Sequence, residues 1–388
     1  MDSSSDTDPD RPRIGRRLQR FAFAGAALTV VSCMLAAPHP RAQAAARTGS
    51  PVHAAPLTIV VVTLDGVRWH EVFEGVDAKL AAQHGMPPSS VVGAAELMPN
   101  LHAIIDTHGV ALGAPGHGSP IVASGPHFVS LPGYAELLSG RSVTACKDNQ
   151  CAGSDASTLV DELSDLSPLE GRDVALVTSW SEIARVASRA SCQAAISSGR
   201  HGGATRQLFG SEATGLALLA LGENANPAPG NGDFRPDALT ADLAIHHLQA
   251  HAPRFLFVGL GEPDEFGHAG NYAGYLASLR AADTRIAEIE RALQDLAARG
   301  TRTALFITAD HGRADGFVEH GKQFPESARV WLVATGSTIE KRGFVSAPRE
   351  RFLADLAPTV RKLAGLPVDH DAHAGTPLTE LLGPAASL

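Results

Sequence analysis

The amino-acid sequence predicts an α/β fold in three layers, α/β/α, with helices on both faces of a largely parallel central sheet. Continuous apolar runs rich in β-branched residues, such as LTIVVVTL at Leu57 to Leu64, recur along the chain. Such runs are typical of strands that are buried on both faces. Longer stretches with helical periodicity separate them, and this alternation favours parallel strands joined by covering helices.

The individual elements follow from these patterns. We predict strands at residues 57–64, 173–178, 254–260, 303–308 and 328–335, and the clearest helices at 272–299 and 352–364. Residues 191–236 are rich in Gly, Asn, Pro and Ser, so we predict an irregular excursion that caps the active-site face. One domain is therefore expected over residues 57–388.

The first 44 residues are predicted to be a signal peptide, followed by a linker over residues 45–56. Five arginines between Arg11 and Arg20 precede an apolar run from Phe21 to Ala37, and a small-x-small cleavage site follows at residues 42–44. We expect an exported protein, periplasmic or secreted, that contacts a membrane only through this leader. An uncleaved anchor and lipid attachment at Cys33 stay open as alternatives.

Charge and composition limit the partners of the protein. The formal net charge is -9 and gives no basic footprint, so no nucleic-acid polymer is expected to bind. Hydrophobic residues make up 44% and charged residues 19% of the chain, as is ordinary for a globular protein. An anionic substrate would therefore need a local positive site, and bound metal ions can supply one.

The cysteines agree with export. Cys146 and Cys151 flank a four-residue loop and are predicted to form a disulfide in an oxidising compartment, which leaves Cys192 over. The alternative is that all three are unpaired core residues. The sequence contains no CxxC pair, which argues against a cysteine zinc site.

Side chains that bind metals follow several of the predicted strands, where ligands bind in sheets of this kind. Taken singly, each has an ordinary alternative as a helix cap, a turn residue or a surface histidine. Together, three Asp and three His suit a centre with oxygen and nitrogen ligands, and six are enough for two ions with open positions. The set is Asp65, Asp264, His268, Asp310, His311 and His320.

Ser130 is a candidate nucleophile. It stands in HFVSLPGY, just before an apolar helical stretch at Ala135 to Leu138. Its ordinary alternative is a helix N-cap. Amides at a helix start favour an anion, and a coordinated metal can turn a hydroxyl into an alkoxide, so the same position suits covalent catalysis.

These motifs resemble the alkaline phosphatase superfamily, and most closely its type I phosphodiesterase/nucleotide pyrophosphatase branch. The matching pieces are VVTLDG, SLPGYAELLSG, EPDEFGH, TADHG and a later HG, in the family's order. Residues 353–367 also resemble the superfamily's closing helix. The resemblance covers most of the chain from Leu57 to Leu382 and implies an alkaline phosphatase-like metallohydrolase domain.

The resemblance also implies roles for the clustered residues. Ser130 would be the nucleophile that is transiently phosphorylated, and two divalent ions, zinc with manganese as an alternative, would be the cofactors. Asn149 stands at a spacing similar to that of the family's phosphate-binding Asn. One ion would be held by Asp65, Asp310, His311 and Ser130, and the other by Asp264, His268 and His320.

The sequence also departs from relatives of this kind. Gly133 and Tyr134 follow the nucleophile where pyrophosphatases commonly have an Asn and an aromatic residue further on, so the nucleobase-holding positions do not transfer. Tyr134 also replaces the Arg of the formylglycine sulfatase motif. Arg141 and Arg313 could each bind a phosphate oxygen, but a surface or supporting role is commoner and both are left out of the predicted site.

The predicted activity is hydrolysis of a small-molecule phosphate ester, a diester or a monoester, through a phosphoserine on Ser130. A phosphomonoesterase is the first alternative. A phosphomutase shares the metal pattern, although the export signal argues against it. A non-catalytic metal-binding protein is the last alternative, and the retention of six ligands and a nucleophile argues against it.

Overall fold

The computed structural model describes residues 56–152, 156–166, 170–189, 192–203 and 205–384. The predicted signal peptide and all but the last residue of the linker lie outside these residues. Within the described part, no helix is long and apolar enough to cross a membrane.

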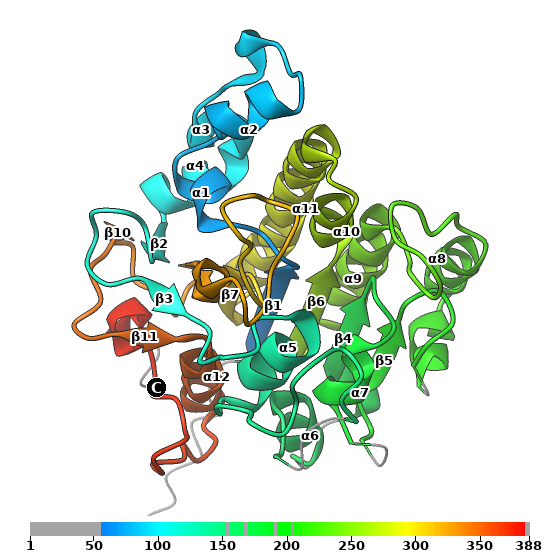
Figure 1. Cartoon of the computed structure of the whole chain (residues 1–388). Coiled ribbons are helices and arrows are strands. Elements are labelled where there is room, and N and C mark those ends of the chain that lie inside the picture. Colours follow the sequence, from blue (N-terminus) through cyan, green and yellow to red (C-terminus); the bar gives the residue numbers. More distant parts are fainter. Residues whose placement is uncertain (1–55, 153–155, 167–169, 190–191, 204, 385–388) are drawn as a thin grey trace, which may run out of the picture. The chain divides into compact units, whose positions relative to one another are not determined.

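The main sheet is largely parallel, as predicted (Figure 1). Its strand order is β10-β2-β9-β7-β1-β6-β4-β5, and β9 alone among its described strands runs against its neighbours β7 and β2. In that order the strands are Gly343–Phe344, Gly109–Leu112, Leu332–Thr335, Arg302–Thr308, Leu57–Leu64, Phe255–Leu260, Val174–Thr178 and Ala195–Ser198. The prediction missed the short strands β2, β5 and β10.

β1 occupies the centre of this sheet because its whole sequence is apolar or β-branched. All eight of its residues are buried, and it pairs in parallel with β6 on one side and β7 on the other.

The predicted strand at 328–335 is wrong in one respect, because it divides at Trp331. Its first part, β8 (Arg329–Val330), joins a small second sheet with β3 (Ile121–Val122) and β11 (Arg351–Phe352). The Trp331 side chain is fully buried and its indole N–H donates to the carbonyl of Val67.

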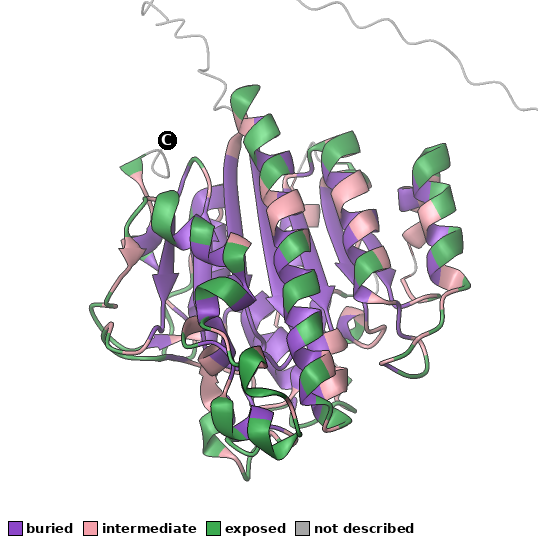
Figure 2. Cartoon of the chain, turned by 90° about the horizontal axis from the view of Figure 1, so that it is seen from above, coloured by how far each residue is buried: buried purple, intermediate pink, exposed green. Residues whose placement is uncertain are grey.

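Helices cover both faces of the main sheet, which confirms the three-layer prediction. One layer contains α4 (Pro99–Thr107), α9 (Asp237–His251) and α11 (Tyr272–Ala298). The other contains α5 (Ser130–Ser139), α6 (Leu159–Ser164), α7 (Ile183–Ala187) and α12 (Leu356–Ala364). Figure 2 shows buried residues on the side of the long helices that faces the sheet and exposed residues on the outer side. The remaining α-helices are α1 (Trp69–Phe73), α2 (Ala78–Gln83), α3 (Ala94–Leu97), α8 (Ala213–Glu223) and α10 (Glu262–His268).

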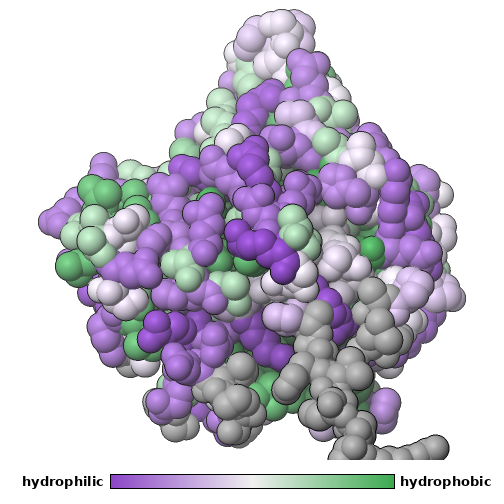
Figure 3. Space-filling model, turned by 180° about the vertical axis from the view of Figure 1, so that it is seen from behind, coloured by the Kyte–Doolittle hydropathy of each residue, from purple (hydrophilic) through white to green (hydrophobic). Residues whose placement is uncertain are grey.

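The segment 191–236 is more regular than predicted, since it contributes β5 to the main sheet and contains α8. The sequence of α8 misled the prediction because it lacks an amphipathic period. Gly215 and Gly222 are buried, whereas Leu216 and Leu221 are 60% and 57% exposed. Figure 3 shows mainly hydrophilic side chains on the back of the molecule, with smaller apolar groups among them.

Candidate metal centre

The six predicted ligands come together at the carboxyl ends of β7, β1 and β6, which are neighbours in the sheet. Asp65 directly follows β1, and Asp310 and His311 follow β7. A single residue, Gly261, separates β6 from the short helix α10, which carries Asp264 and His268. His320 stands in the loop after Asp310 and His311. The register of three parallel strands therefore gathers residues that are far apart in the sequence.

The first predicted ligand group surrounds the hydroxyl of Ser130. Ser130 Oγ lies 3.4 Å from Asp65 Oδ1 and 3.4 Å from His311 Nε2. His311 Nε2 is 3.5 Å from Asp65 Oδ1 and 3.4 Å from Asp310 Oδ2. Ser130 is the first residue of α5 and not its N-cap, which is Val129, so its side chain is not used for capping.

The second predicted group is equally close. His268 Nε2 lies 3.0 Å from Asp264 Oδ2 and 3.1 Å from His320 Nε2. His311 and His320 stack with their ring centroids 4.2 Å apart, which brings the two groups side by side.

The tautomers of two histidines follow from their backbone contacts. His311 Nδ1 is 2.8 Å from the carbonyl of Gly312, and His320 Nδ1 is 3.0 Å from the carbonyl of Phe128. A carbonyl only accepts, so each Nδ1 must donate its proton and each Nε2 keeps its lone pair. Both lone pairs therefore face into the cluster, as metal ligation requires.

The ionisation of the cluster also favours bound cations. Burial, followed by the charges of Asp310 and Asp264, raises the pKa of Asp65 well above its usual value. Burial and the charge of Asp264 likewise raise the pKa of Asp310. Burial lowers the pKa of His311 to about 4 and that of His320 to about 3. Among the described residues no Lys or Arg pairs with Asp65 or Asp310, and divalent ions can supply the counter-charge.

The donor atoms fit metal ions in two groups. Asp264, His268 and His320 form one group. Asp65, Asp264 and His311 form the other, in which Asp264 stands in place of the predicted Asp310, and the ligand atoms of each group lie within 4.8 Å of one another. Asp264 thus belongs to both groups. Asp310 Oδ2 is buried and has no hydrogen-bond partner among the described residues, so a further ligand atom is free at this point.

Two residues outside the predicted site support its ligands, and for Arg313 this is one of the roles that the sequence analysis gave as the commoner. Tyr134, one turn after the nucleophile, is fully buried and donates its hydroxyl proton to Asp65 Oδ2 at 2.9 Å. Arg313, left out of the predicted site, is buried and forms an ion pair with Asp264 Oδ1. The helical spacing of Ser130 and Tyr134 was visible in the sequence, but the direction of either side chain was not. Arg141, by contrast, pairs with Asp369 and Asp371, both of which are exposed.

A pocket of about 210 Å³ opens on this cluster. Ser130 and Asn149 both line it. The Oδ1 atom of Asn149 accepts a hydrogen bond from the backbone amide of Leu131 at 3.0 Å. Trp180 and Phe234, which the sequence analysis did not single out, contribute to its wall. Asn231 and Phe234 belong to the segment 191–236, so part of that segment does border the site as predicted.

The predicted disulfide between Cys146 and Cys151 is present on the loop that carries Asn149, and Cys192 is free.

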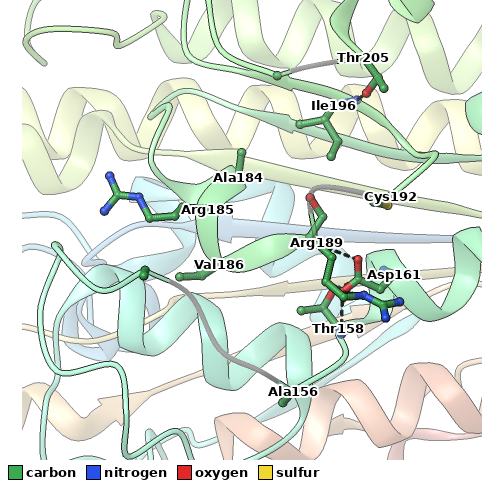
Figure 4. A pocket seen from close by; sticks show the side chains of 13 residues that line it. Ala156, Thr158, Asp161, Ala184, Arg185, Val186, Arg189, Cys192, Ile196 and Thr205 are labelled. Carbon is green, nitrogen blue, oxygen red and sulfur yellow. Dashed lines mark hydrogen bonds and ion pairs between the residues drawn. The ribbon is translucent and has the colours of Figure 1, made fainter.

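A larger cavity, of about 550 Å³, contains none of the predicted site residues. Figure 4 shows Asp161 and Arg189 facing each other beside it, joined by an ion pair. Among the described residues that line it, no group of ligand atoms close enough to hold a metal ion is found, so the smaller pocket is the candidate site.

Comparisons with known proteins agree with this geometry. Residues 233–368 match the sequence model of the Metalloenzyme superfamily, a range that includes five of the six predicted ligands. The 2,3-bisphosphoglycerate-independent phosphoglycerate mutase of Natronomonas pharaonis is 36% identical over 134 residues, which cover 33% of this chain and 24% of that protein. The mutase of the same name from Onchocerca volvulus is 30% identical over 149 residues, 37% of this chain and 28% of that protein. The chain thus spans about a quarter of the length of these curated relatives.

Solved structures share the fold at low sequence identity. A putative sulfatase from Bacteroides thetaiotaomicron has a TM-score of 0.52 and 15% identity, over 83% of this chain and 73% of that one. A 2-O GAG sulfatase has a TM-score of 0.50 and 13% identity, over 84% and 73%. Residues 233–368 are therefore similar in sequence to the Metalloenzyme superfamily, and the chain shares its fold with these solved structures.

Proposed function

We propose that this protein is an exported, two-metal phosphoesterase that hydrolyses a small phosphate ester through a phosphoserine on Ser130. The observation that carries the proposal is the position of Ser130 Oγ. It lies 3.4 Å from both Asp65 Oδ1 and His311 Nε2 and borders the 210 Å³ pocket. A hydroxyl held among metal ligands at the start of a helix is the arrangement expected of an activated nucleophile.

Two divalent ions, proposed to be zinc, would lower the pKa of the hydroxyl and offset the negative charge of the phosphoryl oxygens. Asp65, Asp310 and His311 would hold one, and Asp264, His268 and His320 the other, with Asp264 between the groups. In the first displacement the Ser130 Oγ–phosphorus bond forms, the bond to the leaving oxygen breaks, and the hydroxyl proton leaves with the released alcohol. Water then cleaves the phosphoserine and restores the hydroxyl.

Asn149 is proposed to bind the phosphoryl group. Its Oδ1 is used by the Leu131 amide, so its NH₂ group remains to donate to an anionic oxygen at the pocket. The amides at the start of α5 favour the same charge. Both contacts suit a phosphate ester better than a neutral substrate.

The test compares a phosphate diester with a monoester. With the zinc-loaded protein, kcat/KM is measured for an aryl phosphate diester and for the matching aryl monoester. A ratio well above one supports a phosphodiesterase, and a ratio well below one supports a phosphomonoesterase. Absence of turnover of both esters by protein that holds two zinc ions would reject the proposal.

A phosphomutase is the second candidate, because the curated relatives that match are phosphoglycerate mutases. In a mutase the phosphoserine returns its phosphoryl group to another hydroxyl of the same substrate instead of to water. Incubation with phosphoglycerate distinguishes the two outcomes. An isomerised phosphoglycerate supports the mutase, whereas free phosphate supports the esterase.

A further inference from the structure

Arg313 is a buried cation beside the ligand Asp264. It follows His311 by two residues, and its side chain is fully buried. The guanidinium makes three kinds of contact: Nη1 donates to Asp264 Oδ1, Nε to the carbonyl of Phe317 at 2.6 Å, and Nη2 to the carbonyl of Val318 at 2.6 Å. One planar group therefore joins α10 to the loop that leads to His320.

The surroundings of this guanidinium leave space that only glycine provides. A Cβ added to Gly267 would lie 2.5 Å from Arg313 Cζ, and one added to Gly66 would lie 2.1 Å from Asp264 Oδ1 and 2.8 Å from Arg313 Nη1. A side chain at Gly267 would require Arg313 to move, and one at Gly66 would require both Asp264 and Arg313 to move. Gly66 also has a φ of +63°, which favours glycine independently. The strand end after Asp65 and the helix α10 are thus shaped around Arg313.

The loop that Arg313 holds is itself packed into the core. Phe317 has a φ of 76° and is fully buried, with its ring centroid 5.0 Å from those of both Tyr272 and Tyr275. Its carbonyl accepts from Arg313, as does that of Val318, and His320 follows two residues later. The arginine therefore fixes the backbone just before His320 as well as the carboxylate of Asp264.

The ion pair between Arg313 and Asp264 also determines which oxygen of Asp264 faces His268. Oδ1 is used by Arg313, and Oδ2 lies 3.0 Å from His268 Nε2. A carboxylate with one oxygen held by an arginine and the other turned toward an imidazole is arranged as a metal ligand.

We propose that Arg313 is the positioning residue of the group formed by Asp264, His268 and His320. It turns Asp264 Oδ2 toward His268 and joins α10 to the loop that carries His320. Among the ligands, its ion pair reaches the Asp65–His311 group only through Asp264, which the two groups share. This inference rests on the two-metal centre of the proposed function, so the test measures metal binding directly.

The experiment is a calorimetric zinc titration of the metal-free protein, with bound zinc counted after dialysis. The variants are Arg313→Met, which removes the cation, and Arg313→Lys, which keeps the charge without the planar fork. His320→Ala serves as a reference for loss of the same group. Removal of a partner that orients a ligand typically weakens metal binding by about 10- to 100-fold.

Arg351 provides a matched control. It is also buried, and it bonds to the carboxylates of Asp355 and Glu380 and to the carbonyls of Thr376 and Pro377. Arg351→Lys therefore repeats the same chemical change away from the predicted ligands. It is expected to lower the unfolding temperature and to leave both zinc affinities unchanged.

We expect Arg313→Met to weaken the zinc site that His320→Ala weakens by about 10- to 100-fold, and to weaken the other site less, because the two sites share only Asp264. Arg313→Lys should give an intermediate loss, and it keeps the test usable if the methionine variant does not fold. Two unchanged sites in a folded variant would overturn the inference, and so would equal weakening of both sites. If the unaltered protein itself binds no zinc, the proposed function fails instead, and the two failures are distinct.

Discussion

The side-chain oxygen of Asn149 accepts a hydrogen bond from the backbone amide of Leu131, 3.0 Å away. Leu131 directly follows Ser130, so this bond joins the loop of Asn149 to the first turn of the nucleophile's helix. The loop is closed by the disulfide between Cys146 and Cys151. Arg185 reaches the same loop and donates to the carbonyl of Cys151 at 3.3 Å. A small covalent ring is thereby fixed beside the hydroxyl that is proposed to react.

Substitution of Asn149 is expected to weaken substrate binding more than it slows the chemical step. Asn149→Ala removes a donor to an anionic oxygen, a contact worth about 1.5–3 kcal/mol, so KM should rise about 10-fold or more. Asn149→Asp keeps the acceptor for Leu131 but places a negative charge near the phosphoryl group, and it should be worse than the alanine variant. Steady-state kinetics of the two variants checks this. Equal KM values for both would show that Asn149 does not face the phosphoryl group.

Loss of the disulfide should have the same kinetic signature in weaker form. Cys146→Ser combined with Cys151→Ser leaves every pocket side chain in place but releases the ring that holds Asn149. We expect a higher KM with a smaller change in kcat, together with a lower unfolding temperature, because disulfides restrict the unfolded chain. Cys192→Ser, which alters the free cysteine, is the control and should change neither kinetic constant. A double variant with unchanged KM would mean that the hydrogen bond to Leu131 holds Asn149 without help from the disulfide.

Ser130→Ala should abolish the phosphoenzyme. Acid quenching during turnover of a labelled ester is expected to trap label on the unaltered protein and none on the variant, because the other hydroxyl in contact with the predicted ligands, that of Tyr134, is fully buried and donates to Asp65. Ser139→Ala is a matched control. Ser139 lies on the same helix and is equally buried, but it is at the opposite end of α5. Label retained by Ser130→Ala would assign the nucleophile elsewhere.

Glu136 should make stability depend on pH. It is buried on α5, where burial raises its pKa from 4.5 to about 7 despite hydrogen bonds from Ser124 and Ala354. Because the folded pKa lies above the unfolded one, its stabilising contribution is complete below about pH 4.5 and is lost as the pH rises through 7. The shift corresponds to about 3 kcal/mol.

The Glu136→Gln variant resembles the protonated side chain at every pH. Urea unfolding of both metal-free proteins between pH 5 and 8 is expected to show the unaltered protein losing most of that free energy relative to the variant. Other groups titrate equally in the two proteins, so the difference isolates Glu136. Parallel profiles would contradict the raised pKa.

The sequence was sufficient for the features that depend on local chemistry. Apolar β-branched runs located β1, β4, β6 and β7 to within one residue at each end, and α11 differs from its prediction by one residue. The strand order then brought all six predicted ligands together. Their proximity follows from the rule that parallel strands end at one edge of a sheet.

Other features were decided by tertiary contacts that no local pattern encodes. Trp331 divides a run that appeared continuous, because its side chain is buried against Val67. The sharing of Asp264 between two ligand groups, and its pairing with Arg313, depend on directions of side chains across different strands. The helix α8 was missed because two glycines share its buried face with Leu219, whereas Leu216 and Leu221 are exposed.

The position of β1 has a consequence for how the chain acquires its structure. This strand lies between β6 and β7, whose residues come about two hundred or more positions later in the chain. The first strand to be synthesised must therefore wait for nearly the whole domain before it finds its neighbours, while its eight apolar or β-branched residues remain uncovered. Contacts of such long range form slowly, and exposed segments of this kind promote aggregation. Since Asp65 depends on β1, metal ions bound at the proposed centre would act only after this late step, and they would stabilise a finished fold without nucleating it.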